Sequence, residues 1–470
     1  MSSEASRNEP TSAALLSAIA AKEARVAVIG LGTIGLPLAT FAAASGFRVR
    51  GLDIDPTRVG QINDRTVHFE YSAILRDLDA THMRATTSAT DLAGTDAFFF
   101  CIPTPVDDHG RIVLAHLQNA AQAVAPHIRA GALVVLESSV EIGTTRWFAK
   151  VIEDASGKVA GRDYHLAYCP ERYNPGLPSE QHAQVIYGKK VNLGGPLSYH
   201  NVPRVVGGID ASSTALATRI YSEILASKIQ PVSAPEVAEA AKLMENIFRD
   251  VNIALANEFA EVLGALGVDT YEVVNAASSK GFAFLAHQPG LVGGECIPVD
   301  TWYLIRQAER VGVACDLMRA ARKVNDGVVD HVVGATLDAL ENEGIALPGA
   351  KVTILGTAYK ENVYDDRVSP SRQIAQRLRA KGIDAVLCDP VVKAHNHRTQ
   401  DTLVDLPEAI RDANAVILAT AHREFRDISP ESLAKSVRTR ILVDARNALD
   451  HKAFRAAGFR VTAWGRALDG

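Results

Sequence analysis

The chain has 470 residues, of which 47% are hydrophobic, and its formal net charge is −5. This length suits about three domains with sizeable apolar cores, and the slightly negative charge offers no basic surface for nucleic acid. The sequence contains no run of about 18 apolar residues, so no membrane span is predicted. The five dispersed cysteines lack zinc-site spacing, which predicts no metal site and favours a reducing, cytoplasmic location.

The first 24 residues are predicted to be a leader ahead of the first domain. Their apolar stretch, Thr11–Ala20, faintly resembles the hydrophobic part of an export signal. However, Glu4 and Glu9 offset the basic residue before this stretch, and Lys22 follows it at once, which is unlike an export signal. We therefore expect residues 1–24 to form a frayed leader or a short additional helix.

Residues 25–233 alternate strand and helix patterns. A strand is expected at Arg25–Gly30, a helix at Gly35–Ser45 and a second strand at Arg48–Asp53. Short apolar runs, typical of strands buried on both faces, follow at Ala97–Ile102, Leu133–Glu137, Leu166–Tyr168 and Arg204–Val206. This alternation predicts a parallel, doubly wound α/β domain.

The first strand runs into the pattern Gly30-x-Gly32-x-x-Gly35. Such glycines permit a tight turn, allow the backbone to approach a pyrophosphate and let helix and strand pack closely. Asp53 ends the next strand, where a carboxylate accepts hydrogen bonds from a ribose diol and favours NAD over NADP. Arg58 lies against the adenosine or is an ordinary surface arginine. The alternative for the whole motif is a strand-helix turn without a ligand.

Residues 234–345 are predicted to be a helical central domain. Its first helix spans about residues 234–264, and Lys242, Asn246, Arg249 and Ile253 share one stripe of it. A stripe of this composition is either a solvated face or part of an active site, and spacing alone leaves both open.

Further along, Gly293-Gly294-Glu295-Cys296-Ile297-Pro298-Val299-Asp300 describes a constrained loop that holds a thiol. A thiol beside a nicotinamide allows an aldehyde to be captured covalently and oxidised again to the acid. The alternative is a buried structural cysteine. Ser139 and Glu171 follow predicted strands, where ligands bind in open α/β sheets, or they are capping and surface groups.

Residues 346–470 repeat the strand-helix alternation. The series starts at Lys351–Gly356, and strands are expected to follow at Asp384–Cys388, Ala415–Leu418 and Arg440–Val443. Only Gly356 occupies the turn after the first strand, so a second dinucleotide is not expected there. Lys360 and Arg367 instead suit a phosphorylated ligand. The predicted fold is thus α/β, with two Rossmann-like doubly wound domains joined by a central long-helix region.

Several segments together resemble the UDP-glucose/GDP-mannose dehydrogenase family. The matching stretches are Gly30–Leu38, Ile102–Pro105, Glu137–Thr145, Cys169–Arg172, Lys242–Glu258, Gly293–Asp300 and Leu355–Pro370. The resemblance implies oxidation of the C6 alcohol of a nucleotide sugar to a uronic acid with two NAD⁺, a step of polysaccharide biosynthesis. It also implies a homodimer formed through the long central helix.

The resemblance assigns roles residue by residue. The implied catalytic residues are Cys296 as nucleophile, Lys242 and Asn246 as oxyanion donors, Asp300 and Glu171 as the acid/base pair, and Ser139. The implied cofactor-binding residues are Gly30, Gly32, Thr33, Ile34, Gly35, Asp53, Arg58, Pro103, Thr104 and Ser139. The implied substrate-binding residues are Glu171, Arg172, Lys242, Asn246, Arg249, Gly293, Arg322, Lys360 and Arg367.

Asn246–Glu258 resembles the branch of the family that acts on UDP-N-acetylhexosamines, GlcNAc or ManNAc. One position departs from that branch, because Glu295 stands where His usually precedes the cysteine. A carboxylate beside a thiol disfavours the thiolate. The alternatives are a UDP-glucose or GDP-mannose 6-dehydrogenase, a two-electron dehydrogenase of the hydroxyacid type, and a non-catalytic nucleotide-sugar binder.

Overall fold

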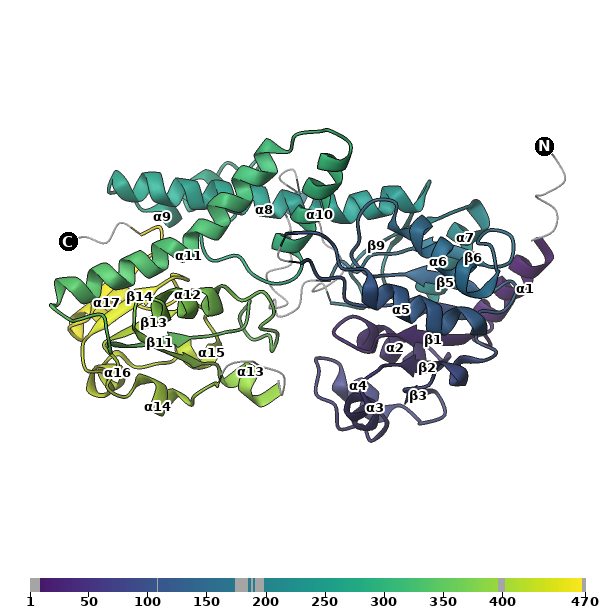
Figure 1. The fold of residues 1–470 in the computed structure, drawn as a ribbon, viewed down its shortest axis with the longest axis horizontal. Helices are drawn as coiled ribbons and strands as arrows, with labels where there is room; N and C mark the ends of the chain where they lie inside the picture. The colour runs from purple at the N-terminus through teal and green to yellow at the C-terminus, as the bar shows by residue number, and fades with distance from the viewer. Residues whose placement is uncertain are drawn as a thin grey trace. The chain divides into compact units, whose positions relative to one another are not determined.

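The computed structural model describes residues 9–107, 109–173, 185–186, 189–190, 198–395 and 402–466. The chain divides into two compact units, each containing one mainly parallel sheet (Figure 1). The first unit comprises residues 1–174, 195–245 and 302–311, and the second comprises 175–194, 246–301 and 312–470. The predicted domains 1–24, 25–233, 234–345 and 346–470 divide the chain differently and stay predictions.

The sheet of the first unit has the strand order β10-β9-β6-β5-β4-β1-β2-β3. Its strands are β1 (Arg25–Ile29), β2 (Arg48–Leu52), β3 (Met83–Thr86), β4 (Ala97–Phe100), β5 (Leu133–Leu136), β6 (His165–Tyr168), β9 (Arg204–Gly208) and β10 (Ile229–Val232). All pairs are parallel except β6 and β9, where Ala167 pairs with Gly208 in antiparallel register. The doubly wound prediction is confirmed, but its fully parallel form is corrected at this one pair.

Apolar composition explains why the central strands form. β4 and β5 are buried at every position, as expected for strands covered on both faces. The helices of this unit are α1 (Glu9–Ala20), α2 (Gly35–Ala44), α3 (Pro56–Asn63), α4 (Ser72–Asp77), α5 (Ala115–Val124), α6 (Thr144–Ser156) and α7 (Ala211–Ile224). Asp55 and Asp210 cap α3 and α7 by accepting hydrogen bonds from backbone N–H groups of the first turn.

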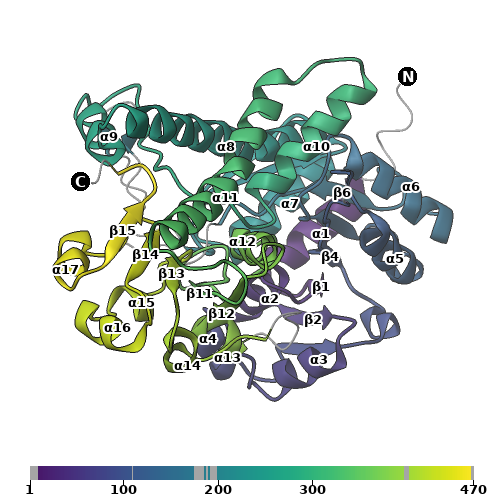
Figure 2. The same ribbon diagram turned by 60° about the vertical axis from the view of Figure 1, so that its left-hand side comes forward.

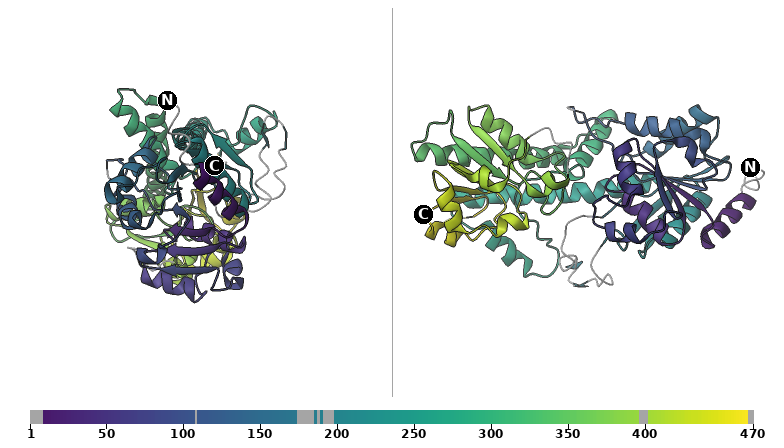
Figure 3. Two further views of the ribbon diagram at one scale, coloured as in Figure 1. Left: turned by 90° about the vertical axis from the view of Figure 1, so that its right-hand side faces the viewer. Right: turned by 90° about the horizontal axis from the view of Figure 1, so that it is seen from below.

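The predicted leader contains a helix, α1, that belongs to the first unit. Leu15 and Ile19 are buried in its core, and the Ser12 hydroxyl lies 3.1 Å from Nε2 of His165. Figure 3 shows α1 at the outer edge of this unit, where it packs against α7. Of the two expectations for this segment, the structure therefore supports the short additional helix.

The second unit has a five-stranded parallel sheet with the order β12-β11-β13-β14-β15. The strands are β11 (Lys351–Leu355), β12 (Asp384–Cys388), β13 (Ala415–Leu418), β14 (Ile441–Asp444) and β15 (Arg460–Ala463). Their helices are α12 (Pro370–Arg379), α13 (Pro390–His395), α14 (Leu406–Ile410), α15 (Arg423–Arg426), α16 (Pro430–Ser436) and α17 (His451–Ala456). The second predicted Rossmann-like sheet is therefore present.

The central helices are α8 (Pro235–Ala265), α9 (Thr270–Ser278), α10 (Ile297–Arg310) and α11 (Asp316–Asn342). The division between the units falls inside α8, after Glu245, and inside α10, after Thr301. Figure 2 shows α11 running along the second sheet, where it packs on β13 and β14. The two short strands β7 (Val185–Ile186) and β8 (Lys189–Lys190) pair with each other. In the described part of the chain, no helix is long and apolar enough to cross a membrane.

Candidate active site

The predicted cofactor residues lie at one edge of the first sheet. Gly30 follows β1, Asp53 follows β2, Thr104 lies just after β4 and Ser139 lies just after β5. Glu171 follows β6 in the same way. Because β1, β2, β4, β5 and β6 are parallel, their carboxyl ends meet at the edge where doubly wound sheets bind ligands.

The glycine turn has the geometry of a dinucleotide cradle. Gly30 adopts φ +86°, and a Cβ atom there would lie 2.5 Å from the carbonyl oxygen of Cys101. A Cβ at Gly35 would lie 1.9 Å from the carbonyl oxygen of Gly30, so helix and strand require a glycine at this contact. Gly32 faces open space, and Thr33 beside it is exposed. This arrangement fits a pyrophosphate at the N-terminus of α2.

Asp53 and Arg58 both hold this turn through Leu31. Oδ2 of Asp53 accepts a hydrogen bond from the backbone N–H of Leu31 at 2.8 Å, and Arg58 donates to the Leu31 carbonyl at 2.9 Å. Asp53 remains half-buried, so its carboxylate keeps access to a ribose. Ile54, directly after Asp53, is 94% exposed.

The loops after β4 and β5 are joined to each other. The Thr104 hydroxyl donates to the Ser139 carbonyl at 2.6 Å, and the Ile102 N–H donates to the Ser138 hydroxyl at 3.0 Å. Pro103 is exposed and Ser139 is half-buried at this edge. The structure therefore brings these predicted cofactor residues together, next to the glycine turn.

Glu171 and Lys242 also meet in the first unit. Both side chains are buried, and Nζ of Lys242 donates to the backbone carbonyl of Glu171. The Glu171 carboxylate lies 3.5 Å from the guanidinium of Arg204, which is 1% exposed and stacks on the Tyr199 ring. Arg204 was not predicted, although an arginine opening a buried apolar strand is a signal for a buried ion pair.

Arg172 is held by other protein groups. Its guanidinium forms an ion pair with Glu245 and donates to the carbonyl of Pro203 at 2.9 Å. The predicted contact of Arg172 with substrate would require these partners to be exchanged, and it stays a prediction.

In the second unit, Cys296 stands immediately before α10. Its carbonyl accepts a hydrogen bond from the N–H of Asp300 at 3.0 Å, which makes Cys296 the N-cap residue of α10. The side chain of Cys296 is exposed, whereas Cys101, Cys169, Cys315 and Cys388 are buried. The alternative of a buried structural cysteine is therefore excluded for Cys296. A helix N-terminus stabilises a thiolate over a thiol.

Arg249 and Asn246 flank this position from α8. Burial lowers the pKa of the Arg249 guanidinium, and the nearby sulfur of Cys296 opposes that shift. Nδ2 of Asn246 donates to Oδ2 of Asp300 at 2.6 Å, and both side chains are buried. Since Lys242 is buried as well, the predicted stripe of α8 is not a solvated face.

Asp250, the residue after Arg249, anchors α8 to two other helices. Its buried carboxylate accepts hydrogen bonds from Arg322 at 2.7 Å, Asn325 at 2.7 Å and Thr301 at 2.9 Å. Arg322 is only 2% exposed and also pairs with Asp326. The structure thus places the Arg322 guanidinium in a buried ion pair, and its contact with substrate stays a prediction.

We call residues 293–296 the thiol loop and residues 359–370, between β11 and α12, the facing loop. The N–H of Gly294 donates to the Val368 carbonyl at 3.1 Å. A Cβ at Gly293 would lie 2.6 Å from Pro370, so this glycine is needed for close packing. Arg367 forms ion pairs with Glu295 and Asp365, and Lys360 is half-buried in the same loop.

The turn after β11 is closed by a side chain. Asp389, which is fully buried, accepts hydrogen bonds from the backbone N–H groups of Thr357 at 2.7 Å and Ala358 at 2.9 Å. The same oxygen lies 3.0 Å from Nε2 of His422. Asp389 follows β12 as Asp53 follows β2, and each accepts the N–H of the second residue after the neighbouring strand. The expectation of no second dinucleotide rests on the missing glycines and stays a prediction.

The remaining surface of the central helices includes an apolar row that we call the α8 stripe. It consists of Met244, Phe248, Leu255, Phe259, Val262 and Leu266, each at least 45% exposed. Their spacing of three, four or seven residues places them on one face of the helix. An exposed apolar row of this length marks an interaction surface.

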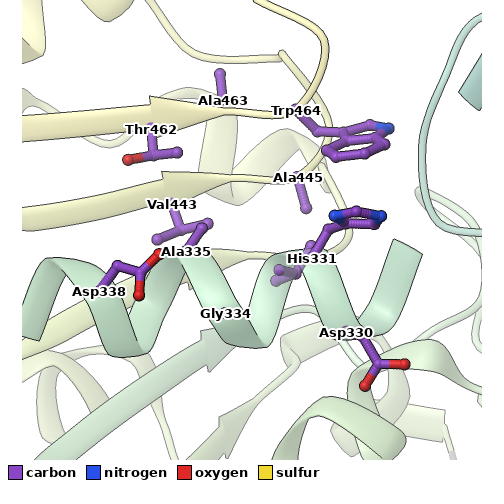
Figure 4. Close-up of a pocket in the computed structure, with 11 residues that line it drawn as sticks. Asp330, His331, Gly334, Ala335, Asp338, Val443, Ala445, Thr462, Ala463 and Trp464 are labelled. Atoms are coloured by element: carbon purple, nitrogen blue, oxygen red, sulfur yellow. The ribbon is translucent and has the colours of Figure 1, made fainter. Parts of the chain in front are cut away.

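A cavity of about 370 Å³ lies between α11 and the strands β14 and β15 (Figure 4). The rings of His331 and Trp464 face each other there, with centroids 4.7 Å apart. No predicted site residue lines it, so it is not assigned to catalysis. Among the described residues, no cluster of three or more His, Cys, Asp or Glu side chains has the arrangement of a metal site.

Comparison with known proteins identifies the family. Three family models match, namely the NAD binding domain of the UDP-glucose/GDP-mannose dehydrogenase family over residues 24–195, its central domain over 236–327 and its UDP binding domain over 353–451. The sheet, the glycine turn and the order of these domains define a NAD-dependent nucleotide-sugar dehydrogenase. The chain belongs to the UDP-glucose/GDP-mannose dehydrogenase family.

Two similar relatives cover nearly all of the chain. A UDP-N-acetyl-D-mannosamine dehydrogenase of Pyrococcus horikoshii is 34% identical over 90% of this chain and 95% of its own length. A UDP-N-acetyl-D-glucosamine 6-dehydrogenase of Pseudomonas aeruginosa is 32% identical over 91% of this chain and 98% of its own. The solved structure of a UDP-D-ManNAc dehydrogenase from Pyrococcus horikoshii superposes with a TM-score of 0.81, at 32% identity, covering 94% of this chain and 99% of the other.

Proposed function

We propose that this enzyme oxidises the C6 alcohol of a UDP-N-acetylhexosamine, GlcNAc or ManNAc, to the uronic acid in two successive NAD⁺-dependent steps. The names of the relatives support the substrate class. The observation that carries the four-electron chemistry is the exposed thiol of Cys296 at the N-terminus of α10. A dehydrogenase that performs a single hydride transfer needs no such thiol.

The proposed reaction uses each of these groups in turn. When bound, NAD⁺ would supply the hydride acceptor for each oxidation. Lys242 assists removal of the hydroxyl proton through a water, and the sulfur of Cys296 then adds to the aldehyde to give a thiohemiacetal. The second oxidation leaves a thioester on Cys296. Asp300 or Glu171 activates the water that hydrolyses it to the uronic acid.

Lys242 and Asn246 are one turn apart on α8 and supply the donors for the tetrahedral oxyanions. Removing one such donor typically costs on the order of 10²–10³ in rate. On the cofactor side we propose the glycine turn with Thr33, Ile34, Asp53 and Arg58, and the loops that carry Pro103, Thr104 and Ser139. On the substrate side we propose Glu171, Arg172, Arg249, Gly293, Arg322, Lys360 and Arg367.

The yield of NADH per sugar tests the proposal. Purified enzyme with limiting UDP-sugar and excess NAD⁺ is expected to release two NADH per sugar, with UDP-GlcNAc or UDP-ManNAc giving a higher kcat/KM than UDP-glucose and GDP-mannose. A yield of one NADH would indicate a two-electron dehydrogenase instead. Tight UDP-sugar binding without NADH would indicate a non-catalytic binder.

Asp53 is expected to set the cofactor preference. In Asp53→Asn, loss of the carboxylate removes a charge-assisted hydrogen bond to the ribose diol and the repulsion of a 2′-phosphate. KM for NAD⁺ is expected to rise by about tenfold and discrimination against NADP⁺ to fall. Steady-state kinetics with both cofactors measures this. An unchanged NAD⁺/NADP⁺ ratio would mean that Asp53 serves only to accept the backbone N–H groups of Leu31 and Asp55.

We also propose a cytoplasmic homodimer in which a second copy covers the α8 stripe. The support is an exposed apolar row along a 31-residue helix, interrupted at Asn252, together with the dispersed cysteines that suit a reducing compartment. The double variant Leu255→Glu/Phe259→Glu is expected to be a monomer in light scattering after gel filtration. Glu341→Lys, an exposed change on α11, is the control and should leave the mass unchanged. A double variant with the wild-type mass would show that this row is not the interface.

A further inference from the structure

Glu295 precedes Cys296 directly, and a negative charge beside a thiol opposes formation of the thiolate. Burial raises the pKa of Glu295, an effect that the neighbouring Arg367 counteracts. The carboxylate is thus poorly solvated, and its charge depends on a partner outside the thiol loop.

That partner is Arg367 in the facing loop. The guanidinium of Arg367 forms an ion pair with Glu295 and a bidentate pair with Asp365, at 2.9 and 2.6 Å. Asp365 therefore orients the guanidinium of Arg367, and Glu295 pairs with the nitrogen that Asp365 leaves available, Nη1. The planar, fixed arrangement of donors makes such a pair geometrically specific.

The backbone around the pair fixes its position. The Gly294 N–H bonds to the Val368 carbonyl, and a Cβ at Gly294 would lie 2.8 Å from the ring of Tyr359. Gly293 packs equally closely on Pro370. The ion pair is therefore one of several contacts between the thiol loop and the facing loop, rather than an isolated contact of two surface side chains.

Charged residues that interact with the sulfur or lie within one helical turn of Cys296 in the chain come from three elements. Arg249 on α8 interacts electrostatically with the sulfur, and Asp300 lies one turn into α10. Glu295 is the third, in the thiol loop itself. Glu295 is the one of these three that is adjacent to Cys296 in the chain, and it is negatively charged when ionised. Arg367 is the cation that offsets the charge of Glu295.

We propose that Arg367 is a positioning residue for the thiol, acting through Glu295, whose carboxylate it anchors and neutralises so that Cys296 can ionise. The proposal rests on the proposed function only in taking Cys296 as the nucleophile. The resemblance implies that Arg367 binds substrate. The proposal adds an effect of Arg367 on the ionisation of Cys296 that does not require substrate.

The pH dependence of Cys296 alkylation tests this directly. The rate of iodoacetamide addition to the substrate-free enzyme reports the fraction of thiolate, and the other four cysteines are buried. In Arg367→Gln the midpoint of the rate profile is expected to rise by about one pH unit, because Glu295 is left uncompensated. The double variant Glu295→Gln/Arg367→Gln should return the midpoint toward the wild-type value.

Two controls make the comparison specific. Cys296→Ala gives the background from other thiols. Arg377→Gln removes an arginine of similar exposure that pairs with Asp330 in the same unit, and it should leave the midpoint unchanged.

Three results would overturn the proposal. The first is an unshifted midpoint in Arg367→Gln, and the second is a double variant with the same raised midpoint as the single one, because Arg367 would then act without Glu295. If Arg367→Gln does not fold, the variant Glu295→Gln replaces it, and its alkylation midpoint is expected to fall below the wild-type value. An unchanged midpoint in Glu295→Gln is the third overturning result. Failure of the proposed function is distinguishable, because it appears as an NADH yield other than two in the wild-type enzyme.

Discussion

Replacing Cys296 with serine is expected to abolish uronic acid formation while leaving NAD⁺ binding intact. Serine keeps the size of the side chain, but its hydroxyl is a far weaker nucleophile at neutral pH, so the aldehyde is no longer held as a covalent adduct. The rate of uronic acid formation should fall by about a thousandfold or more. Mass spectrometry of the sugar product, together with NADH released per sugar, measures the effect.

The control for this variant is its affinity for NAD⁺, measured by titration calorimetry, which should match that of the wild-type enzyme because the glycine turn is untouched. Reaction should stall during or after the aldehyde stage. A serine variant that still releases two NADH per sugar at the wild-type rate would refute a covalent role for Cys296.

The second large effect is expected for Asp250→Ala. Asp250 is fully buried and accepts hydrogen bonds from Arg322, Asn325 and Thr301, so the substitution leaves a buried guanidinium with only Asp326 as its counter-charge. Breaking a buried pair from one side typically costs about 3–5 kcal/mol. The free energy of unfolding from urea titration should decrease by about that amount.

Asp330→Ala provides the matched control, since Asp330 is largely exposed in its pair with Arg377 and should contribute less than about 1 kcal/mol. The double variant Asp250→Ala/Arg322→Met removes both charges and should recover part of the lost stability. If the double variant is no more stable than Asp250→Ala, the loss arises from packing and not from the unpaired charge.

The sequence was a good guide to the two sheets because their strands are short, apolar runs between glycine turns. It did not indicate that β9 runs antiparallel to β6. The run Arg204–Gly208 is buried at every position, and burial on both faces looks the same for either strand direction. Direction depends on the connection before the strand, which composition does not specify.

For the candidate site, strand ends indicated Ser139 and Glu171, and helix spacing indicated the stripe with Lys242, Asn246 and Arg249. Thr104 and Asp300 came from the family resemblance, and the structure pairs them with Ser139 and Asn246. The partners of the arginines could not be predicted. Arg367 lies 72 positions after Glu295, and nothing local to either residue indicates their contact. The capping position of Cys296 was missed because Pro298 suggested an irregular loop, whereas proline is well tolerated in the first turn of a helix.

The glycine turn after β1 has a consequence for the timing of the proposed reaction. Gly356 is the one glycine in the corresponding turn after β11, so we expect the turn after β1 to hold the redox carrier for both oxidations. The reduced carrier must then leave, and an oxidised one must bind at the same place, between the two oxidations. A sugar tethered to sulfur can wait through that exchange, whereas an untethered aldehyde would be free to diffuse away.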